Sequence, residues 1–310
     1  MTSVSEVLGE PIKANVARRR RWDVIFVGIG VIALGIALLT LVALIFQLVV
    51  AGAPRLDGEF FLSFPSRRAS SAGILSAWVG TILIMLVTAV IGVIVGVAAG
   101  VYLEEYAPKR WWTDIIEINV TNLAGVPSIV YGLLALGLFV YQLGLGRSIL
   151  TAGLTLALLI LPIIIVATRE SIRAIPNSVR EAAYACGATR WRVTADHVVP
   201  YATPGIMTGV IIGLARAIGE TAPLITIGAL TFIAFLPPPP ITAEFPFISF
   251  EWLSAGFTVM PIQMFNWVSR PGAAFQENAA AAGLVLLVMT LLMNAGAIYL
   301  RFRIRRNIKW

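Results

Sequence analysis

The chain has 310 residues, of which 58% are hydrophobic and 13% are charged, and its formal net charge is +7. This apolar content exceeds what the core of a soluble protein of that length can bury, so lipid must cover much of it. One histidine and one cysteine are too few for a zinc site or a Ser-His-Asp hydrolase. We therefore expect an all-α membrane protein that is not an enzyme and that holds neither a metal nor a cofactor.

Runs without charged residues predict where the chain crosses the membrane. Five such runs equal or exceed the roughly 20 residues of helix that cross a bilayer, and a sixth is interrupted only by Arg216 and Glu220. We predict six spanning helices, at 25–50, 74–103, 120–144, 148–168, 205–234 and 279–300. They form one transmembrane domain, residues 24–303, between a basic N-terminal segment, 1–23, and a short tail, 304–310.

The basic residues are distributed unevenly between the loops. The N-terminal segment, the second loop, the fourth loop and the tail carry 17 Lys and Arg residues, whereas the other loops carry five. The positive-inside rule therefore places both termini and the fourth loop, residues 169–203, in the cytosol. Nucleic-acid binding is a poorer explanation of the basic charge, because these arginines cluster at helix ends, where lipid phosphates lie.

The fourth loop is too polar for lipid, yet it is patterned like two short helices. Ser178 to Glu181 fits a capping box at the start of the first helix, and Gly187 can adopt the left-handed conformation that ends it. Thr189 can cap a second helix, which we expect Pro200 to stop. The sequence thus predicts a helix pair that lies against the membrane surface.

The spacing within this loop matches a known motif. Glu181-Ala182-Ala183, three residues, Gly187, nine residues and His197-Val198-Val199-Pro200 resemble the EAA loop of ABC-importer permeases, which usually has Ile and Leu at the positions of His197 and Val199. The resemblance implies a type I ABC importer permease in which Glu181, Ala182, Ala183 and Gly187 belong to a coupling helix that sits in a groove of an ATPase subunit. The alternative is a pair of amphipathic helices that merely bridges two spans. The chain has no Gly-x-x-x-x-Gly-Lys-Ser/Thr loop, so a partner must bind the ATP.

Small residues recur every four positions in two predicted spans. They are Gly92, Gly96 and Gly100 in the second span, and Gly205, Gly209, Gly213, Ala217 and Thr221 in the fifth. Such rows let another helix approach closely. We expect them to form tight helix seams, within this chain or with a second permease subunit.

Arg216 and Glu220 are the charged residues inside a predicted span. An ionised group in lipid is tolerated only when it is paired or faces a polar path, and residues four apart share a helix face. A continuous helix over 204–235 would be about 48 Å long against a hydrocarbon core of about 30 Å, so we expect a break, at Gly219 and Pro223. The pair either fixes packing alone or lines a pathway, where the arginine would bind a tetrahedral oxyanion and the glutamate would accept its proton. Sulfate at neutral pH has no such proton.

Three stretches resemble one family within the ABC-importer permeases. Residues Ala215-Arg216-Ala217-Ile218-Gly219-Glu220-Thr221-Ala222-Pro223-Leu224 are similar to the signature of the PstA family, the A-type permeases of bacterial phosphate importers. Ala124 to Gly132 and Phe265 to Pro271 look like the same family. The resemblance implies a subunit of the bacterial inner (plasma) membrane that translocates inorganic phosphate, with Arg216 and Glu220 in the substrate pathway.

The same resemblance implies partners: a homologous C-type permease in a heterodimer, an ATPase subunit homodimer and a periplasmic or lipid-anchored phosphate-binding protein. Two other functions stay open. One is an ABC permease for another oxyanion, such as sulfate or molybdate, and the other is an ion-coupled secondary carrier. Inverted repeats, which are typical of secondary carriers, are not evident in the sequence.

Overall fold

The computed structural model describes residues 4–241 and 247–307, and the regular structure of these residues is helical apart from one isolated bridge between Ile241 and Ile248. The α-helices in this part of the chain are α1 (Val4–Gly52), α2 (Gly58–Leu62), α3 (Leu75–Val101), α4 (Trp111–Leu123), α5 (Ser128–Ala135), α6 (Ile149–Arg173), α7 (Asn177–Ala185), α8 (Arg190–Arg192), α9 (Val199–Ile218), α10 (Ala222–Thr226), α11 (Met260–Val268) and α12 (Ala273–Asn307). π-Helical turns extend three of them, at Tyr102–Tyr106, Leu136–Gln142 and Val193–Val198. The all-α prediction is confirmed.

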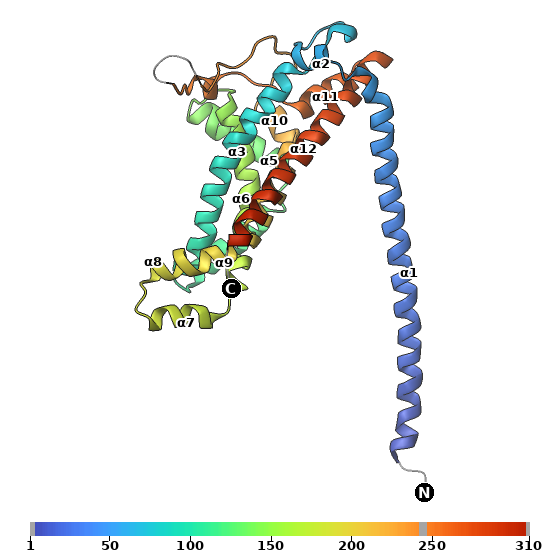
Figure 1. The fold of residues 1–310 in the computed structure, drawn as a ribbon, viewed down its shortest axis with the longest axis vertical. Helices are drawn as coiled ribbons and strands as arrows, with labels where there is room; N and C mark the ends of the chain where they lie inside the picture. Colours follow the sequence, from blue (N-terminus) through green and yellow to red (C-terminus); the bar gives the residue numbers. More distant parts are fainter. Residues whose placement is uncertain (1–3, 242–246, 308–310) are drawn as a thin grey trace. The chain divides into compact units, whose positions relative to one another are not determined.

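The chain forms two compact units, one that ends at Ala51 and one that begins at Gly52. The first consists of α1, a single uninterrupted helix (Figure 1). Its apolar part belongs to a stretch, Trp22–Arg55, that is long enough to cross a membrane and that contains the predicted span 25–50. The first spanning helix is therefore confirmed.

Four helices of the second unit are also long and apolar enough to cross a membrane. They are Leu75–Tyr106, Ile149–Arg173, Arg190–Ile218 and Ala273–Arg303. Three of them confirm the predicted spans at 74–103, 148–168 and 279–300. The fourth differs from its prediction.

The third predicted span, 120–144, is wrong as one straight helix. Instead, α4 and the helix that continues α5 to Gln142 are bent by 109° at the residues between them. Pro127 explains the bend, because its ring removes an amide donor and disfavours helical backbone at the preceding Val126. The described residues thus contain five helices able to cross a membrane, or six when this bent pair is taken as one span.

The fifth predicted span, 205–234, is displaced toward the N-terminus. Its helix ends at Ile218, and the short α10 follows. The predicted break is confirmed: Gly219 terminates α9, and Pro223 lies in the first turn of α10, where a helix does not need its amide donor. Beyond α10 the chain has no further helix before Glu251 among the described residues, so the span does not reach 234.

Pro200 does not stop the second loop helix, contrary to the prediction. The helix continues from Arg190 through Ile218, with Pro200 in the first turn of α9. The π-helical turn Val193–Val198 lies directly before it, so the hydrogen-bond ladder is already interrupted where the proline would otherwise break it. The loop therefore runs without a stop into the spanning helix.

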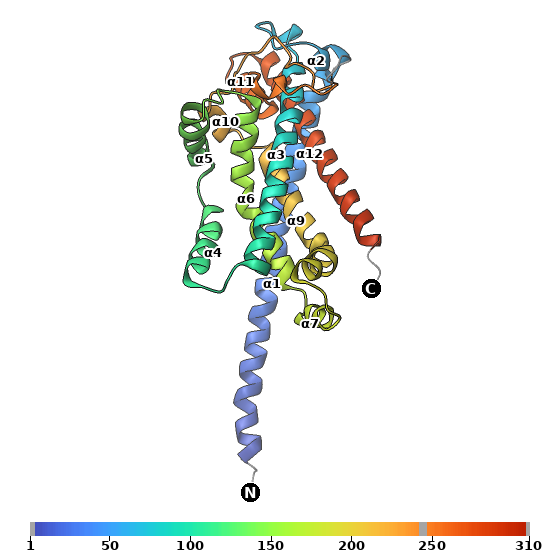
Figure 2. The same cartoon turned by 90° about the vertical axis from the view of Figure 1, so that its left-hand side faces the viewer.

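α3, α6 and α9 pack side by side and form the core of the second unit (Figure 2). Glycines allow the close approach. A Cβ added to Gly96 of α3 would lie 2.8 Å from Cγ2 of Ile164 in α6, and a Cβ added to Gly209 of α9 would overlap Cβ of Ala167. The predicted seams are confirmed as far as Ala217, and both lie within this chain against α6, whereas Thr221 lies beyond the end of α9.

The second unit has two distinct ends. α2 and α11 lie at one end and α7 and α8 at the other (Figure 1). We call these the α11 end and the α7 end. A second apolar cluster holds the α11 end together, with the rings of Phe60 and Trp267 5.9 Å apart.

Candidate functional site

The loop between α6 and α9 contains the turn and the cap that the sequence predicts. Gly187 follows α7 with a φ of +81°, in the left-handed region that favours glycine. Its amide donates to the carbonyl oxygen of Tyr184 at 2.9 Å. The hydroxyl oxygen of Thr189 then accepts from the amide of Arg192 at 3.5 Å and caps α8. The turn at Gly187 and the cap at Thr189 are confirmed.

The capping box predicted at Ser178 and Glu181 is wrong. α7 has Pro176 at its N-cap and no side-chain cap. Because Pro176 already has extended backbone, with ψ of 140°, the helix begins before Ser178 and places it inside the first turn. Arg180 secures this end of α7 instead, by donating to the carbonyl oxygen of Ile175 at 2.9 Å.

The four residues of the EAA-like motif have different surroundings. Glu181, Ala182 and Gly187 are exposed, whereas Ala183 is buried in the main apolar core, to which Val193 also belongs. α7 therefore packs through Ala183 and turns the carboxylate of Glu181 outward. This leaves one face of α7 free to contact another protein.

A buried carboxylate joins both loop helices to the end of α3. Glu105 lies in the π-helical turn Tyr102–Tyr106, and only 8% of its side chain is exposed. Arg180 of α7 donates from Nη2 and Nε to Oε1 of Glu105, at 2.7 and 3.1 Å. Arg190 of α8 donates to the carbonyl oxygen of Glu105, and its guanidinium carbon lies 5.0 Å from the centre of the Tyr106 ring. One turn of chain thus binds α7 and α8 together.

A second charge network lies at the same end of the molecule. Arg169 of α6, whose side chain is 7% exposed, pairs with Glu104 at 3.3 Å and with Glu117 of α4 at 2.6 Å. Arg173 pairs with the same two carboxylates, each at 3.0 Å. Arg173 also pairs with Glu170 at 3.3 Å, so the network contains two arginines and three carboxylates. It holds α4 and the end of α3 against α6.

Reasoning from the sequence missed Glu104, Glu105 and Glu117 as partners of the loop arginines. A signal was present, because Glu104 and Glu105 directly follow the charge-free run 69–103, and Arg169 directly follows the run 148–168. Two spans that end at the same membrane face bring the charges after them to the same depth. Opposite charges at equal depth are candidates for pairing.

Arg216 and Glu220 are paired where α9 ends. Nε of Arg216 lies 3.3 Å from Oε1 of Glu220. Glu220 is already outside α9, but its amide donates to the carbonyl oxygen of Ala217 at 3.2 Å, and this turn keeps its carboxylate within reach of the arginine. The Arg216 side chain is 40% exposed and that of Glu220 18%, so this chain alone leaves the pair partly open.

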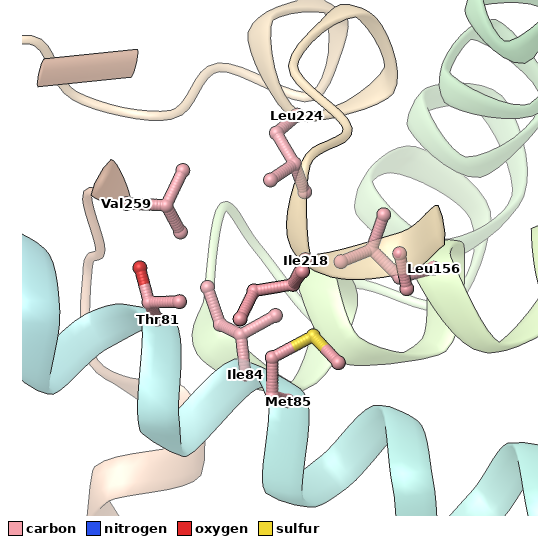
Figure 3. A pocket seen from close by; sticks show the side chains of 8 residues that line it. Thr81, Ile84, Met85, Leu156, Ile218, Leu224 and Val259 are labelled. Atoms are coloured by element: carbon pink, nitrogen blue, oxygen red, sulfur yellow. The ribbon is translucent and has the colours of Figure 1, made fainter. Parts of the chain in front are cut away.

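Part of the other side of α9 is closely packed at this level. Ala217 and Ile218, which follow Arg216, line a cavity of about 10 Å³ together with apolar side chains of α3, α6 and α10 (Figure 3). Thr81 contributes the one hydroxyl labelled in this lining, and that oxygen accepts from the amide of Met260 at 3.0 Å. A cavity of this size holds about one water molecule. A larger cavity of about 300 Å³ also borders Ile218, but its lining is apolar apart from Thr81 and offers no charge to an oxyanion. The charged side of α9 at this level is that of Arg216.

The two chain breaks lie close together. α5 and α10 are the short helices that follow them, and a Cβ added to Gly132 of α5 would lie 2.6 Å from Cα of Pro223 in α10. The hydroxyl of Tyr131 donates to the carbonyl oxygen of Leu123 at 2.8 Å, across the break between α4 and α5. Irregular backbone within a membrane requires protein or a polar cavity around it.

The guanidinium of Arg216 keeps most of its hydrogen-bonding capacity. Within 4–241 and 247–307 its side chain makes one hydrogen bond, from Nε to Glu220, and neither Nη group is engaged. Two free Nη groups on a planar cation can bind two oxygens of a tetrahedral oxyanion. The carboxylate of Glu220 can accept a proton from the same ligand.

Known proteins resemble this chain over most of its length. Residues 92–306 match the family described as "Binding-protein-dependent transport system inner membrane component". A phosphate transport system permease protein PstA 1 of Mycobacterium tuberculosis is 31% identical over 75% of this chain and 71% of the relative. The corresponding PstA proteins are 32% identical in Xylella fastidiosa, over 81% and 82% of the two chains, and 29% identical in Yersinia pestis, over 93% and 92%.

Solved structures agree with the fold. An inward-facing form of the MetNI methionine ABC transporter matches with a TM-score of 0.54 and 17% identity, over 73% of this chain and 93% of the other. An amino acid ABC transporter with histidines matches with a TM-score of 0.52 and 17% identity, over 74% and 93%. At such identity the likeness shows the fold alone, which is that of type I ABC importer permeases. The family match and the relatives at 31–32% identity show that the chain belongs to the binding-protein-dependent transport system inner membrane components and, among them, to the PstA-type permeases.

Proposed function

We propose that this chain is the permease subunit that carries inorganic phosphate across the bacterial inner membrane, in an importer driven by ATP hydrolysis in a separate ATPase subunit. The observation that carries the proposal is the partly open Arg216–Glu220 pair at the break between α9 and α10. Relatives named as phosphate transport system permease proteins support the same substrate.

Arg216 and Glu220 have complementary roles in this pathway. The two free Nη groups of Arg216 attract and orient the phosphate oxygens. Glu220 then accepts a hydrogen bond, or a proton, from hydrogen phosphate. A carboxylate at this position repels sulfate, which has no proton to donate at neutral pH, so the pair favours phosphate over sulfate.

The α7 end couples the permease to its ATPase. α7 presents Glu181 and Ala182 outward, and Ala183 and the turn at Gly187 fix how the helix sits on the bundle. In this proposal α7 occupies a groove of the ATPase subunit and follows its closure when ATP binds. Two ATPase subunits form a homodimer, one beneath each permease.

The remaining partners follow from the incomplete site. A homologous C-type permease forms a heterodimer with this chain and completes the pathway on the side where Arg216 is exposed. A periplasmic or lipid-anchored binding protein delivers phosphate to the α11 end. The basic segment 1–23, the loop 169–203 and the tail 304–310 all lie in the cytosol, by the positive-inside rule.

Reconstitution tests the proposal directly. The chain is co-expressed with its neighbouring permease, ATPase and binding protein, purified and placed in liposomes, and the entry of radiolabelled phosphate is followed with and without ATP. We expect ATP-dependent uptake that excess sulfate or molybdate does not compete with at pH 7. Equal competition by sulfate would assign the chain to another oxyanion, and uptake driven by an ion gradient without ATP would make it a secondary carrier.

A further inference from the structure

Arg180 and Arg190 tie the loop helices to α3, which is not their neighbour in sequence. The backbone joins α6 and α9 directly to this loop. α3 contacts the loop only from a distance in sequence, because Glu105 and Arg180 are 75 positions apart. The exposed fractions of these two side chains are 8% and 16%. A buried pair with two short hydrogen bonds is broken only at a substantial cost, because the remaining charge would be unpaired.

The far end of α3 is attached to a different part of the chain. The hydroxyl of Ser76 donates to the carbonyl oxygen of Ile233 at 3.2 Å, and the amide of Met260 donates to the hydroxyl oxygen of Thr81 at 3.0 Å. Both bonds are buried; the first reaches Ile233, between α10 and α11, and the second reaches Met260, the first residue of α11. The helical stretch between these attachments, Leu75–Tyr106, spans about 48 Å at 1.5 Å per residue.

We infer that Glu105, Arg180 and Arg190 form a clamp that makes α3 move with the coupling loop and so transmits ATPase closure to the segment between α10 and α11. The inference rests on the proposed function, since it presupposes that α7 docks on the ATPase. The three residues are positioning residues, because none of them lies near Arg216 or the phosphate pathway. Without the clamp, the loop still moves α6 and α9, and α3 follows through its packing against α6 and through the ion pairs of Glu104 with Arg169 and Arg173, but no longer through α7 and α8.

A pair of matched glutamine variants tests the clamp in the reconstituted importer. Glu105→Gln removes the buried carboxylate charge and keeps the side-chain length. Glu170→Gln is the control, since Glu170 is 64% exposed and pairs with Arg173 only three residues away on the same helix. We measure co-purification of the ATPase, ATP hydrolysis and phosphate uptake. Glu105→Gln should assemble and hydrolyse ATP, but its uptake per ATP should fall by about fivefold or more, which corresponds to loss of a typical coupling free energy.

A distance measurement keeps the inference testable if Glu105→Gln fails to assemble. The chain has one cysteine, the exposed Cys186 after α7, which takes one spin label, and Ile94→Cys on an exposed position of α3 takes the second. In the otherwise unchanged complex, the distance between the labels should stay constant between the ATP-free and ATP-bound states. Uptake by the labelled complex controls for the labels. A distance that changes with ATP would show that α3 and the loop move separately and would overturn the inference.

The outcomes also separate this inference from the proposed function. If the complex without substitutions shows no ATP-driven phosphate uptake, the proposed function fails. If that complex transports phosphate and Glu105→Gln matches it in uptake per ATP, the clamp alone is refuted. If Arg180→Lys keeps the uptake per ATP of the unsubstituted complex and Arg180→Gln loses it, the clamp depends on the positive charge at position 180 rather than on side-chain volume.

Discussion

Replacing Arg216 and Glu220 by glutamine, singly and together, distinguishes a role in transport from a role in packing. Each single change leaves one charge without its partner, and the double change leaves none. If the pair only stabilises the fold, the double variant should recover much of what either single variant loses. If the arginine binds phosphate, the double variant should be no better than Arg216→Gln.

The geometry limits how large a structural effect can be. The charged atoms are 3.3 Å apart, four residues apart in sequence, and the side chains are 40% and 18% exposed. A pair that faces a water-filled pathway contributes about 0.2–1 kcal/mol to stability, whereas a charge left unpaired in lipid costs several kcal/mol. Because ~1 kcal/mol changes an equilibrium about fivefold, loss of a water-facing pair cannot reduce uptake much beyond that factor at matched protein levels. A larger loss that the double variant recovers would instead mark a pair in lipid.

Phosphate uptake in cells that lack other phosphate carriers is the appropriate assay. Membrane levels of the three variants are matched by immunoblot, and co-purification of the ATPase shows that the complex still assembles. We expect Arg216→Gln and the double variant both to lose more than about tenfold in uptake, beyond the fivefold that loss of a water-facing pair can explain. Near-normal uptake by the double variant would refute the pathway role and leave packing as the explanation.

Three further predictions address the fold, the loop and the topology. Gly100→Ala should destabilise the purified subunit by about 1–3 kcal/mol in thermal unfolding, since the added Cβ would lie 2.6 Å from Cβ of Thr168. Gly137→Ala is the control and should not destabilise the subunit, because a Cβ there has no neighbour within 4 Å. Gly187→Val should abolish coupled uptake while the subunit still inserts, because valine is strained at a φ of +81°, and Gly187→Asn should retain more activity. A reporter fused after Trp310 should be active only in the cytosol, since five basic residues follow the last span, and a periplasmic signal would invert the topology.

The spanning helices could be predicted where charged residues mark both ends of an uncharged run. α3, α6 and α12 fall at the expected places because each is bounded by charged residues that cannot enter lipid cheaply. The bend between α4 and α5 could not be found in this way, because the run 118–146 has no charge at the bend. Pro127 was visible, but a proline within a spanning helix is often accommodated, so it does not by itself predict a bend of 109°.

In the loop between α6 and α9, features that depend on neighbouring residues could be predicted, whereas contacts between distant residues could not. Gly187 and Thr189 depend on their own backbone and on neighbours within a few residues, so the sequence predicts the turn and the cap. The start of α7 depends on Pro176 competing with Ser178 for the cap position, which spacing alone does not decide. The pair between Glu105 and Arg180 joins residues 75 positions apart, and only the packing of α3 beside α6 brings them together.

The direction in which Arg216 points depends on the glycine row of α9. Gly209, Gly213 and Ala217 face α6 or the buried core, because a Cβ at Gly209 would meet Ala167 and one at Gly213 would lie 3.4 Å from Cβ of Ile160. Successive residues on an α-helix are turned by about 100°, so the residue before Ala217 points away from that seam. The row that packs α9 against α6 therefore also presents the guanidinium on the open side. A bulky residue at Gly209 would rotate or displace α9 and so change where the guanidinium of Arg216 points, without touching either charge.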